Sequence, residues 1–157
     1  MNNNEEIMSL HNQLCFPIYL CSKELIRRYT PMLEKLDLTY TQYIVMMFLW
    51  EKKSGNVTDI SKVLLLDSGT LTPLLKKLES KGYITRERSK VDERNLNVKI
   101  TEEGLALKKK AAKIPTQIDK IINLTEKEQR ELYALICKVL LNVNKEEWHA
   151  INRSQWW

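Results

Sequence analysis

Three cysteines are the residues of this 157-residue chain that could do covalent chemistry. Cys15, Cys21 and Cys137 are odd in number and widely spaced, which fits neither a disulfide framework nor a CxxC metal pair. A free cysteine is most often a small buried hydrophobic residue, and each of the three can be read in this way. A cysteine in the first turn of a helix has a second reading, because free backbone N–H groups there favour the reactive thiolate.

A second group of residues, between positions 68 and 100, could bind phosphate. This fifth of the chain has eight Lys and Arg against four acids, and so carries +4 of the net charge of +5. The basic residues are Lys76, Lys77, Lys81, Arg86, Arg88, Lys90, Arg94 and Lys99. Concentrated positive charge is the electrostatic signature of a nucleic-acid interface, although a solvated basic face on an ordinary helix gives the same count.

Other kinds of site find little support in the sequence. His11 and His149 are isolated, and no acidic or thiol cluster at ligand spacing accompanies them, so we expect no metal site. The chain has no phosphate-binding glycine loop and no nucleophile paired with a base, so we expect neither a cofactor nor an enzyme. A thiol peroxidase is the weaker enzymatic reading, since it would need a reductant to recycle its cysteine.

The basic residues lie on a predicted helix followed by a predicted hairpin. Residues 69–81 have helical spacing, and Gly82 stands where a helix ends most easily. The leucines of one stripe are Leu71, Leu74, Leu75 and Leu78. Residues 83–88 and 96–100 alternate as two strands around a polar turn. A polar-faced helix that leads into a short basic hairpin is typical of a winged helix-turn-helix.

The preceding segment predicts the rest of that DNA-reading unit. Thr39 and Gln42 form a capping box for an apolar helix over residues 43–53, and residues 54–56 are expected to turn the chain. A short helix over residues 58–65 and a tight turn over residues 66–69 then lead to the basic helix. This helix, turn, helix order is the two-helix unit that reads DNA.

Helical patterns at both ends extend beyond this unit. At the N-terminal end we expect a helix from about Asn12, with Cys15 in its first turn, Cys21 in the core and Pro31 at the exit. At the C-terminal end, Thr101 should cap a long helix to about residue 123 that bends at Pro115. A capping box of Thr125 and Glu128 opens the last helix, to about residue 144, with Cys137 on its apolar side.

The apolar stripes of the terminal helices are larger than a small winged helix can cover, so we expect them to pair across a two-fold axis. The fold class is then mainly α with a small β-hairpin wing, in one domain over residues 1–157. Residues 39–100 form the DNA-binding region, and residues 9–30 and 102–144 form the dimerisation region. The chain has no apolar run long enough for a membrane and no secretory signal, so we expect a cytoplasmic protein.

Together these features resemble the MarR family of transcriptional regulators over nearly the whole chain. Residues 14–16, Tyr19, Tyr29, residues 38–43 and the string Leu66-Asp67-Ser68-Gly69-Thr70-Leu71-Thr72-Pro73-Leu74-Leu75-Lys76 resemble its organic-hydroperoxide-sensing (OhrR-like) branch. The Asp92-Glu93-Arg94 tip between the two strands is typical of the whole family.

The resemblance implies a redox-sensing role for the N-terminal cysteine, here Cys15. It implies that Tyr19 and Tyr29 of the partner subunit contact the sulfur, and Tyr40 could also donate a hydrogen bond to it. Fourteen helical residues separate Cys15 from Tyr29 by roughly 21 Å, so they can meet only between antiparallel subunits. Some relatives use a second, resolving thiol, for which Cys137 is a candidate.

The resemblance also implies the DNA-binding residues. Arg94 would enter the minor groove with Asp92 holding it. Ser68, Thr70 and Thr72 would meet phosphates and base edges, and the charge of Lys76, Lys77 and Arg86 completes the predicted interface.

The expected function is therefore that of a homodimeric repressor that binds palindromic operator DNA and releases it when organic hydroperoxide oxidises Cys15. The alternative is a regulator of the same family that a small phenolic or lipophilic ligand controls, with Cys15 as a structural residue.

Overall fold

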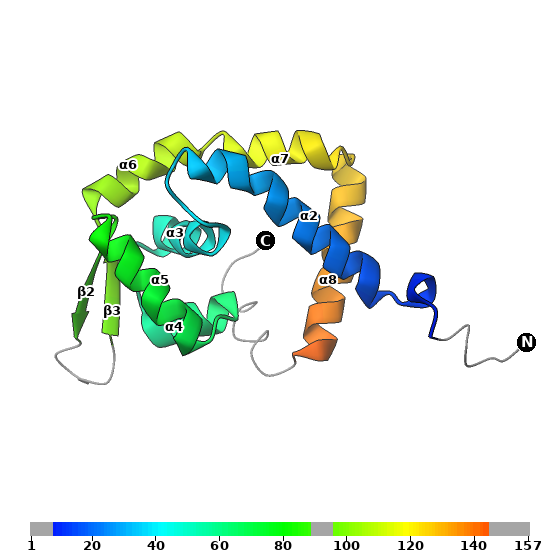
Figure 1. The fold of residues 1–157 in the computed structure, drawn as a ribbon, viewed down its shortest axis with the longest axis horizontal. Coiled ribbons are helices and arrows are strands. Elements are labelled where there is room, and N and C mark those ends of the chain that lie inside the picture. The colour runs from blue at the N-terminus through cyan, green and yellow to red at the C-terminus, as the bar shows by residue number, and fades with distance from the viewer. Residues whose placement is uncertain (1–7, 89–95, 145–157) are drawn as a thin grey trace, which may run out of the picture. The chain divides into compact units, whose positions relative to one another are not determined.

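The structure of the chain is a computed structural model that describes residues 8–88 and 96–144. The chain divides into two compact units, Met1–Tyr40 and Thr41–Trp157, which are described separately. The elements are η1 (Leu10–Asn12), α2 (Cys15–Glu34), α3 (Tyr40–Lys52), β1 (Ser54–Asn56), α4 (Val57–Leu64), α5 (Ser68–Ser80), β2 (Ile84–Arg88), β3 (Leu96–Ile100), α6 (Glu102–Ala111), α7 (Ile114–Ile122) and α8 (Glu126–Val143) (Figure 1). The predicted class, mainly α with a winged helix-turn-helix, is confirmed.

Helix α2 forms most of the first unit. It begins at Cys15, so the prediction that this cysteine lies in the first turn is confirmed. The prediction that Pro31 ends the helix is wrong, because α2 continues through it to Glu34. An interior proline removes one backbone hydrogen bond of the helix, and the Thr30 hydroxyl donates to the Ile26 carbonyl at 3.3 Å one turn earlier. The chain leaves the helix only where Asp37 takes a left-handed conformation, with φ of 52°.

The core of the second unit fixes the basic helix. The four leucines of the predicted stripe on α5 are all buried, as are apolar residues of α3, α4 and the sheet. These partners are Val45, Met46, Leu49, Ile60, Ile84, Val98 and Ile100. Burying a leucine side chain contributes about 1.5–3 kcal/mol, so the apolar stripe holds α5 in one rotation and turns its polar side outward.

The wing is a three-stranded antiparallel sheet in the order β1-β3-β2 rather than a hairpin alone. Its two predicted strands are confirmed, and Ile84 pairs with Ile100 while Arg88 pairs with Leu96. The prediction that residues 54–56 form a turn is wrong, because they pair with β3 from Ser54 opposite Lys99 to Asn56 opposite Asn97. Residues of these types have low strand propensity, so the pairing with β3 makes the strand.

Two glycines set how the wing joins the helices on either side. Gly82, with φ of 76°, ends α5 at the predicted place in a conformation that a side chain would strain. At Gly104, near the start of α6, a Cβ would collide with the Tyr83 carbonyl. This close approach lets the Trp50 indole N–H donate to the Gly104 carbonyl at 2.8 Å. Helix α3 and the turn before β2 therefore both lie against the start of α6.

The predicted long helix after the wing consists of two helices, α6 and α7, which are separated at residues 112–113. Thr101 caps α6 as predicted, and Pro115 lies in the first turn of α7. Proline lacks the N–H that would continue the first helix but fits the start of a new one. The predicted capping box of Thr125 and Glu128 opens α8. None of the described helices has the length and apolar character that crossing a membrane requires.

Candidate nucleic-acid interface and cysteine site

The start of helix α5 is held by Asp67, its N-cap residue. The Asp67 carboxylate accepts hydrogen bonds from the Thr70 backbone N–H at 2.9 Å and from the Thr70 hydroxyl at 2.8 Å. The hydroxyl of Thr70, and then its N–H group, lower the pKa of Asp67. This cap orders the first turn of α5, which contains Ser68 and Thr70.

The polar side of α5 is open to solvent. Ser68, Thr70, Thr72, Lys76 and Lys77, which the sequence predicted to bind DNA, are all exposed. The Thr70 hydroxyl already donates its proton to Asp67, so it can accept but not donate in a further contact while the cap is intact. Ser68, Thr72 and the two lysines remain as donors to phosphate or base edges.

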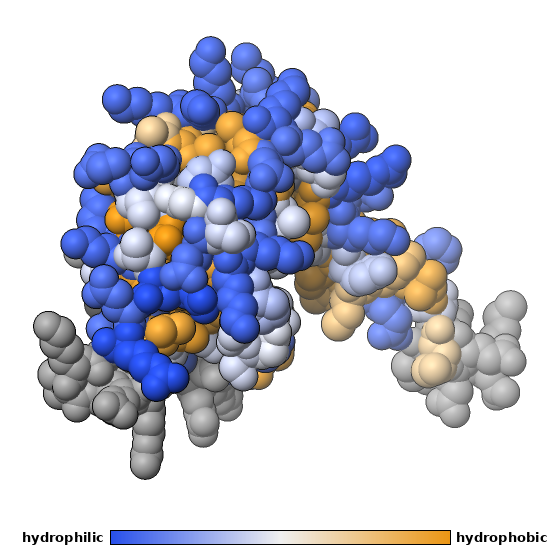
Figure 2. Space-filling view, turned by 60° about the vertical axis from the view of Figure 1, so that its left-hand side comes forward, coloured by the Kyte–Doolittle hydropathy of each residue, from blue (hydrophilic) through white to orange (hydrophobic). Residues whose placement is uncertain are grey.

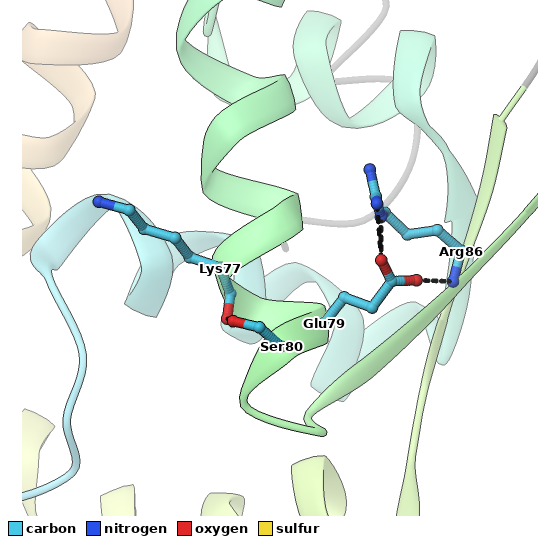
Figure 3. Close-up of polar contacts among 4 residues, drawn as sticks. All are labelled: Lys77, Glu79, Ser80 and Arg86. Atoms are coloured by element: carbon cyan, nitrogen blue, oxygen red, sulfur yellow. Dashed lines mark hydrogen bonds and ion pairs between the residues drawn. The ribbon is translucent and has the colours of Figure 1, made fainter.

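Arg86 of strand β2 is joined to Glu79 of α5 by three hydrogen bonds (Figure 3). Glu79 Oε2 accepts from Arg86 Nε at 2.9 Å and from Nη2 at 2.6 Å, and Oε1 accepts from the Arg86 backbone N–H at 3.0 Å. The hydrogen bond from the guanidinium is the main cause of a lowered pKa at Glu79. Sequence reasoning predicted Arg86 as a DNA ligand and missed Glu79. The neighbouring Lys77 extends to the other side of the helix.

Asp92 and Arg94, the predicted minor-groove pair, lie outside the described residues. The strands on either side, β2 and β3, are described and are paired in register.

The predicted sensing residues lie in the first unit. Cys15 is the first residue of α2 and is exposed. Tyr19, one turn further on, is 59% exposed, and the Lys23 ammonium lies 6.0 Å from the centre of its ring. A hydroperoxide from solvent can therefore reach the thiol in the isolated chain.

Two more of the predicted tyrosines form a pair. The rings of Tyr29 and Tyr40 are 5.0 Å apart between centres and meet edge to face at 65°. Burial raises the pKa of Tyr40, so its phenol keeps its proton at neutral pH and can donate a hydrogen bond. The structure thus brings together Tyr29 with Tyr40, and separately places Tyr19 one helical turn from Cys15.

The other two cysteines differ from each other. The prediction that Cys21 is a core residue is wrong, because it is exposed on α2, whose one buried residue is Leu33. Cys137 is half-buried on α8 beside Tyr133. Burial, followed by a hydrogen bond and the charge of Cys137, raises the pKa of Tyr133. Within residues 8–88 and 96–144, no three His, Cys, Asp or Glu residues are grouped so as to hold a metal ion.

The Asp67 cap has a testable dependence on pH. Its pKa is lowered in the folded chain, so the carboxylate stabilises the fold above its ordinary pKa and loses this effect as the pH falls through the lowered value. Asparagine caps a helix without titrating. We expect Asp67→Asn to unfold near the wild-type temperature at pH 7 and to lose less stability than wild type when the pH is lowered below the ordinary pKa of aspartate, to about 2.5, whereas Asp67→Ala unfolds at a lower temperature at pH 7. Thermal unfolding followed by circular dichroism measures both effects, and equal losses in the two variants would contradict the assigned cap.

Comparisons with known proteins agree with this geometry. The family described as "Transcriptional regulator SarA/Rot" matches residues 27–111. The organic hydroperoxide resistance transcriptional regulator of Bacillus subtilis is 40% identical over 146 residues, which are 93% of this chain and 99% of the relative. Reduced AbfR bound to DNA, from a protein of Staphylococcus epidermidis, has a TM-score of 0.74 at 31% identity, over 89% of this chain and 98% of that one. A MarR mutant from Escherichia coli in complex with operator DNA has a TM-score of 0.74 at 28% identity, over 89% and 99%.

The winged helix-turn-helix and these similarities define a transcriptional regulator rather than an enzyme. The chain belongs to the MarR family of winged-helix regulators, within the group described as SarA/Rot, and it is similar to the organic-hydroperoxide branch that the sequence motifs indicated.

Proposed function

We propose that the chain is a homodimeric, cytoplasmic repressor that binds palindromic operator DNA and releases it when organic hydroperoxide oxidises Cys15. The observation that carries the proposal is an exposed thiol on the first residue of α2 in a chain that also presents a capped, polar-faced recognition helix. The B. subtilis relative is named for organic hydroperoxide resistance, and the AbfR neighbour was solved in a reduced state on DNA. Both names support the same function here.

The proposed dimer uses the helices at the two ends of the chain. Apolar side chains reach the surface of both units, as the orange areas among the blue ones illustrate (Figure 2). On α2 they are Ile18, Tyr19, Leu20 and Ile26, and on α8 they are Leu132, Tyr133, Leu135, Ile136, Val139 and Val143. No described residue of α8 is buried. Apolar surface of this extent is typical of an oligomer interface, so residues 9–30 and 102–144 remain our assignment for the dimer region.

The proposed sensing reaction is a two-electron oxidation of one sulfur. The Cys15 thiolate attacks the outer oxygen of the hydroperoxide, an S–O bond forms and the O–O bond breaks. The organic oxygen leaves as an alcohol after it takes up a proton, and Cys15 becomes a sulfenic acid. Tyr19 and Tyr29 of the second subunit, with Tyr40, contact the sulfur. Oxidation changes these hydrogen bonds and favours a dimer state in which the two recognition helices no longer match the operator.

A gel-shift experiment with the protein and the DNA upstream of its own coding sequence tests the proposal, with and without cumene hydroperoxide. We expect a complex that forms under reducing conditions and dissociates after oxidation. A complex that ignores the oxidant but dissociates with a phenolic ligand would instead support the ligand-controlled regulator. Absence of any complex with a palindromic site would refute DNA binding.

Within this proposal, Arg94 supplies a minor-groove contact. We expect Arg94→Ala to weaken operator binding and to reduce the slope of log K against log salt by about one, because one phosphate-associated counterion fewer is released. Fluorescence anisotropy with labelled operator at four salt concentrations measures the slope. Lys35→Ala is the control, since it removes one exposed positive charge at the end of α2, outside both the proposed DNA interface and the proposed dimer region. An unchanged slope in Arg94→Ala would remove this residue from the interface.

A further inference from the structure

We infer that Glu79 is a positioning residue that sets the place of the wing strand β2 relative to the recognition helix α5. This inference rests on the proposed DNA binding, and it assigns a role to an acidic residue within a basic region. In this role Glu79 acts through Arg86, to which it is hydrogen-bonded, rather than as a ligand of the nucleic acid.

The contact between Glu79 and Arg86 holds main chain as well as side chain. One carboxylate oxygen accepts two N–H groups of the guanidinium, and the other accepts the backbone N–H of Arg86 at 3.0 Å. An ordinary surface ion pair fixes only the ends of two flexible side chains and contributes little. Here the Arg86 side chain is only 17% exposed and that of Glu79 is 36% exposed, so the pair is partly shielded from water. Charge-assisted, forked hydrogen bonds of this kind impose a definite geometry.

The pair lies next to the turn about which the wing would rotate. Between the end of α5 and the start of β2 there are only three residues, 81–83, and Gly82 among them has φ of 76°. Thr101 supports this turn, because its hydroxyl donates to the Gly82 carbonyl at 2.6 Å and its N–H donates to the Tyr83 carbonyl at 3.1 Å. Glu79 binds β2 beyond this turn, at Arg86, the third residue of the strand. A small rotation of the backbone at the turn would displace the strand at this position, and the hydrogen bonds of Glu79 oppose that displacement.

Because Glu79 is negatively charged, the direction in which DNA affinity changes when it is removed distinguishes a positioning role from simple neutralisation of Arg86. A carboxylate near phosphates opposes DNA binding, so a Glu79 that only neutralised Arg86 would reduce affinity, and its removal would strengthen the complex. A Glu79 that places the strand has the opposite effect, because its removal lets the strand and its basic residues leave the groove. Arg86 uses two of its five N–H donors on Glu79, and the three that remain can meet a phosphate only where the fork holds them.

The test compares Glu79→Gln with Glu87→Gln in the full-length reduced protein. Both substitutions remove one negative charge, and Glu87 is the exposed neighbour of Arg86 on β2, paired with Asn97. Anisotropy with the upstream duplex at several salt concentrations gives affinity and salt slope. We expect Glu87→Gln to bind as tightly as wild type or more tightly, and Glu79→Gln to bind about tenfold more weakly with a slope shallower by about one. A loss of folded protein alone would lower the active fraction without changing the slope.

Arg86→Lys provides a second variant, because it keeps the positive charge but loses the fork. It should also bind more weakly than wild type with a shallower slope. The inference is overturned if Glu79→Gln binds as tightly as Glu87→Gln, or if Arg86→Lys is indistinguishable from wild type. If wild-type protein binds no upstream duplex, the proposed function fails, and that result is distinct from an equal affinity of the two glutamine variants.

Discussion

Cys15→Ser is expected to bind operator DNA as tightly as wild type and to remain bound after treatment with organic hydroperoxide. Serine keeps the size and hydrogen-bonding ability of the reduced side chain, so the reduced dimer state should be preserved. A hydroxyl does not attack the O–O bond under these conditions, so the state that oxidation favours should not form. Coupling between two sites is typically 5–150-fold in affinity, and the wild-type complex should weaken by roughly this factor.

The measurement is a titration of labelled operator with each protein before and after a stoichiometric addition of cumene hydroperoxide. Mass spectrometry of the same samples should find about 16 Da added to wild type on the peptide of Cys15, as one oxygen requires. Cys21→Ser is the matched control, since Cys21 is also exposed on α2, and it should release DNA as wild type does. Release that persists in Cys15→Ser would place the sensor elsewhere.

The behaviour of Cys137 distinguishes a single-cysteine mechanism from one in which a second thiol forms a disulfide with oxidised Cys15. With a single-cysteine mechanism, oxidised wild type runs as a monomer on a non-reducing gel, and Cys137→Ser still releases DNA. With a resolving thiol, an intersubunit disulfide appears and depends on both cysteines. The half-buried position of Cys137 beside Tyr133 shows that it is less open to solvent than Cys15 in the chain described here.

Local patterns in the sequence predicted the recognition helix well. The leucine stripe of α5 repeats with a period of 3.6 residues, and Gly82 follows it, so burial and the end of the helix could both be read from neighbouring residues. The capping box of Thr125 and Glu128 is a local signal of the same kind. Such features were confirmed because each depends on contacts only three or four residues apart.

Features that depend on distant partners could not be predicted in this way. Strand β1 exists because β3 pairs with it from more than 40 residues away, and its own residues favour a turn. The bond between Glu79 and Arg86 crosses from a helix to a strand, so no helical or strand period joins the two. The predicted helix end at Pro31 was wrong for another reason. A proline weakens a helix without ending it when the residues on both sides remain helical, as they do in α2.

The prediction that Cys21 is a core residue was wrong because the apolar face of α2 is exposed in the single chain. Its spacing places it with the apolar residues of α2, and a pattern of this kind is usually read as a core face. In the described chain Leu33 is the one buried residue of that helix, so the apolar face is open. Sequence periodicity identifies a face that is to be covered, but it does not distinguish cover by the same chain from cover by a second copy.

Pairing with a second copy through α8 leads to a prediction about the dimer and its affinity for operator DNA. Ile136 lies within the apolar face of α8 and is 46% exposed, beside Leu135, which is 62% exposed. An aspartate at position 136 would have to lose its hydration when two subunits pack through this face, which costs several kcal/mol without a partner charge. We therefore expect Ile136→Asp to be monomeric at micromolar concentration. Because two linked DNA-binding units gain on the order of 100-fold or more over one, operator affinity should fall by a similar factor.

Ala134→Asp is the matched control for this prediction. It introduces the same charge two residues away, which is about 200° around the helix from position 136, and Ala134 is also exposed. Sedimentation analysis should find Ala134→Asp dimeric and Ile136→Asp monomeric, while circular dichroism finds both helical. Since α8 has no buried residue in the described chain, the charge at position 136 should not unfold the monomer, and loss of DNA binding would then follow from loss of the dimer. A dimeric Ile136→Asp that still binds operator would show that α8 is not the interface and that another surface joins the two recognition helices.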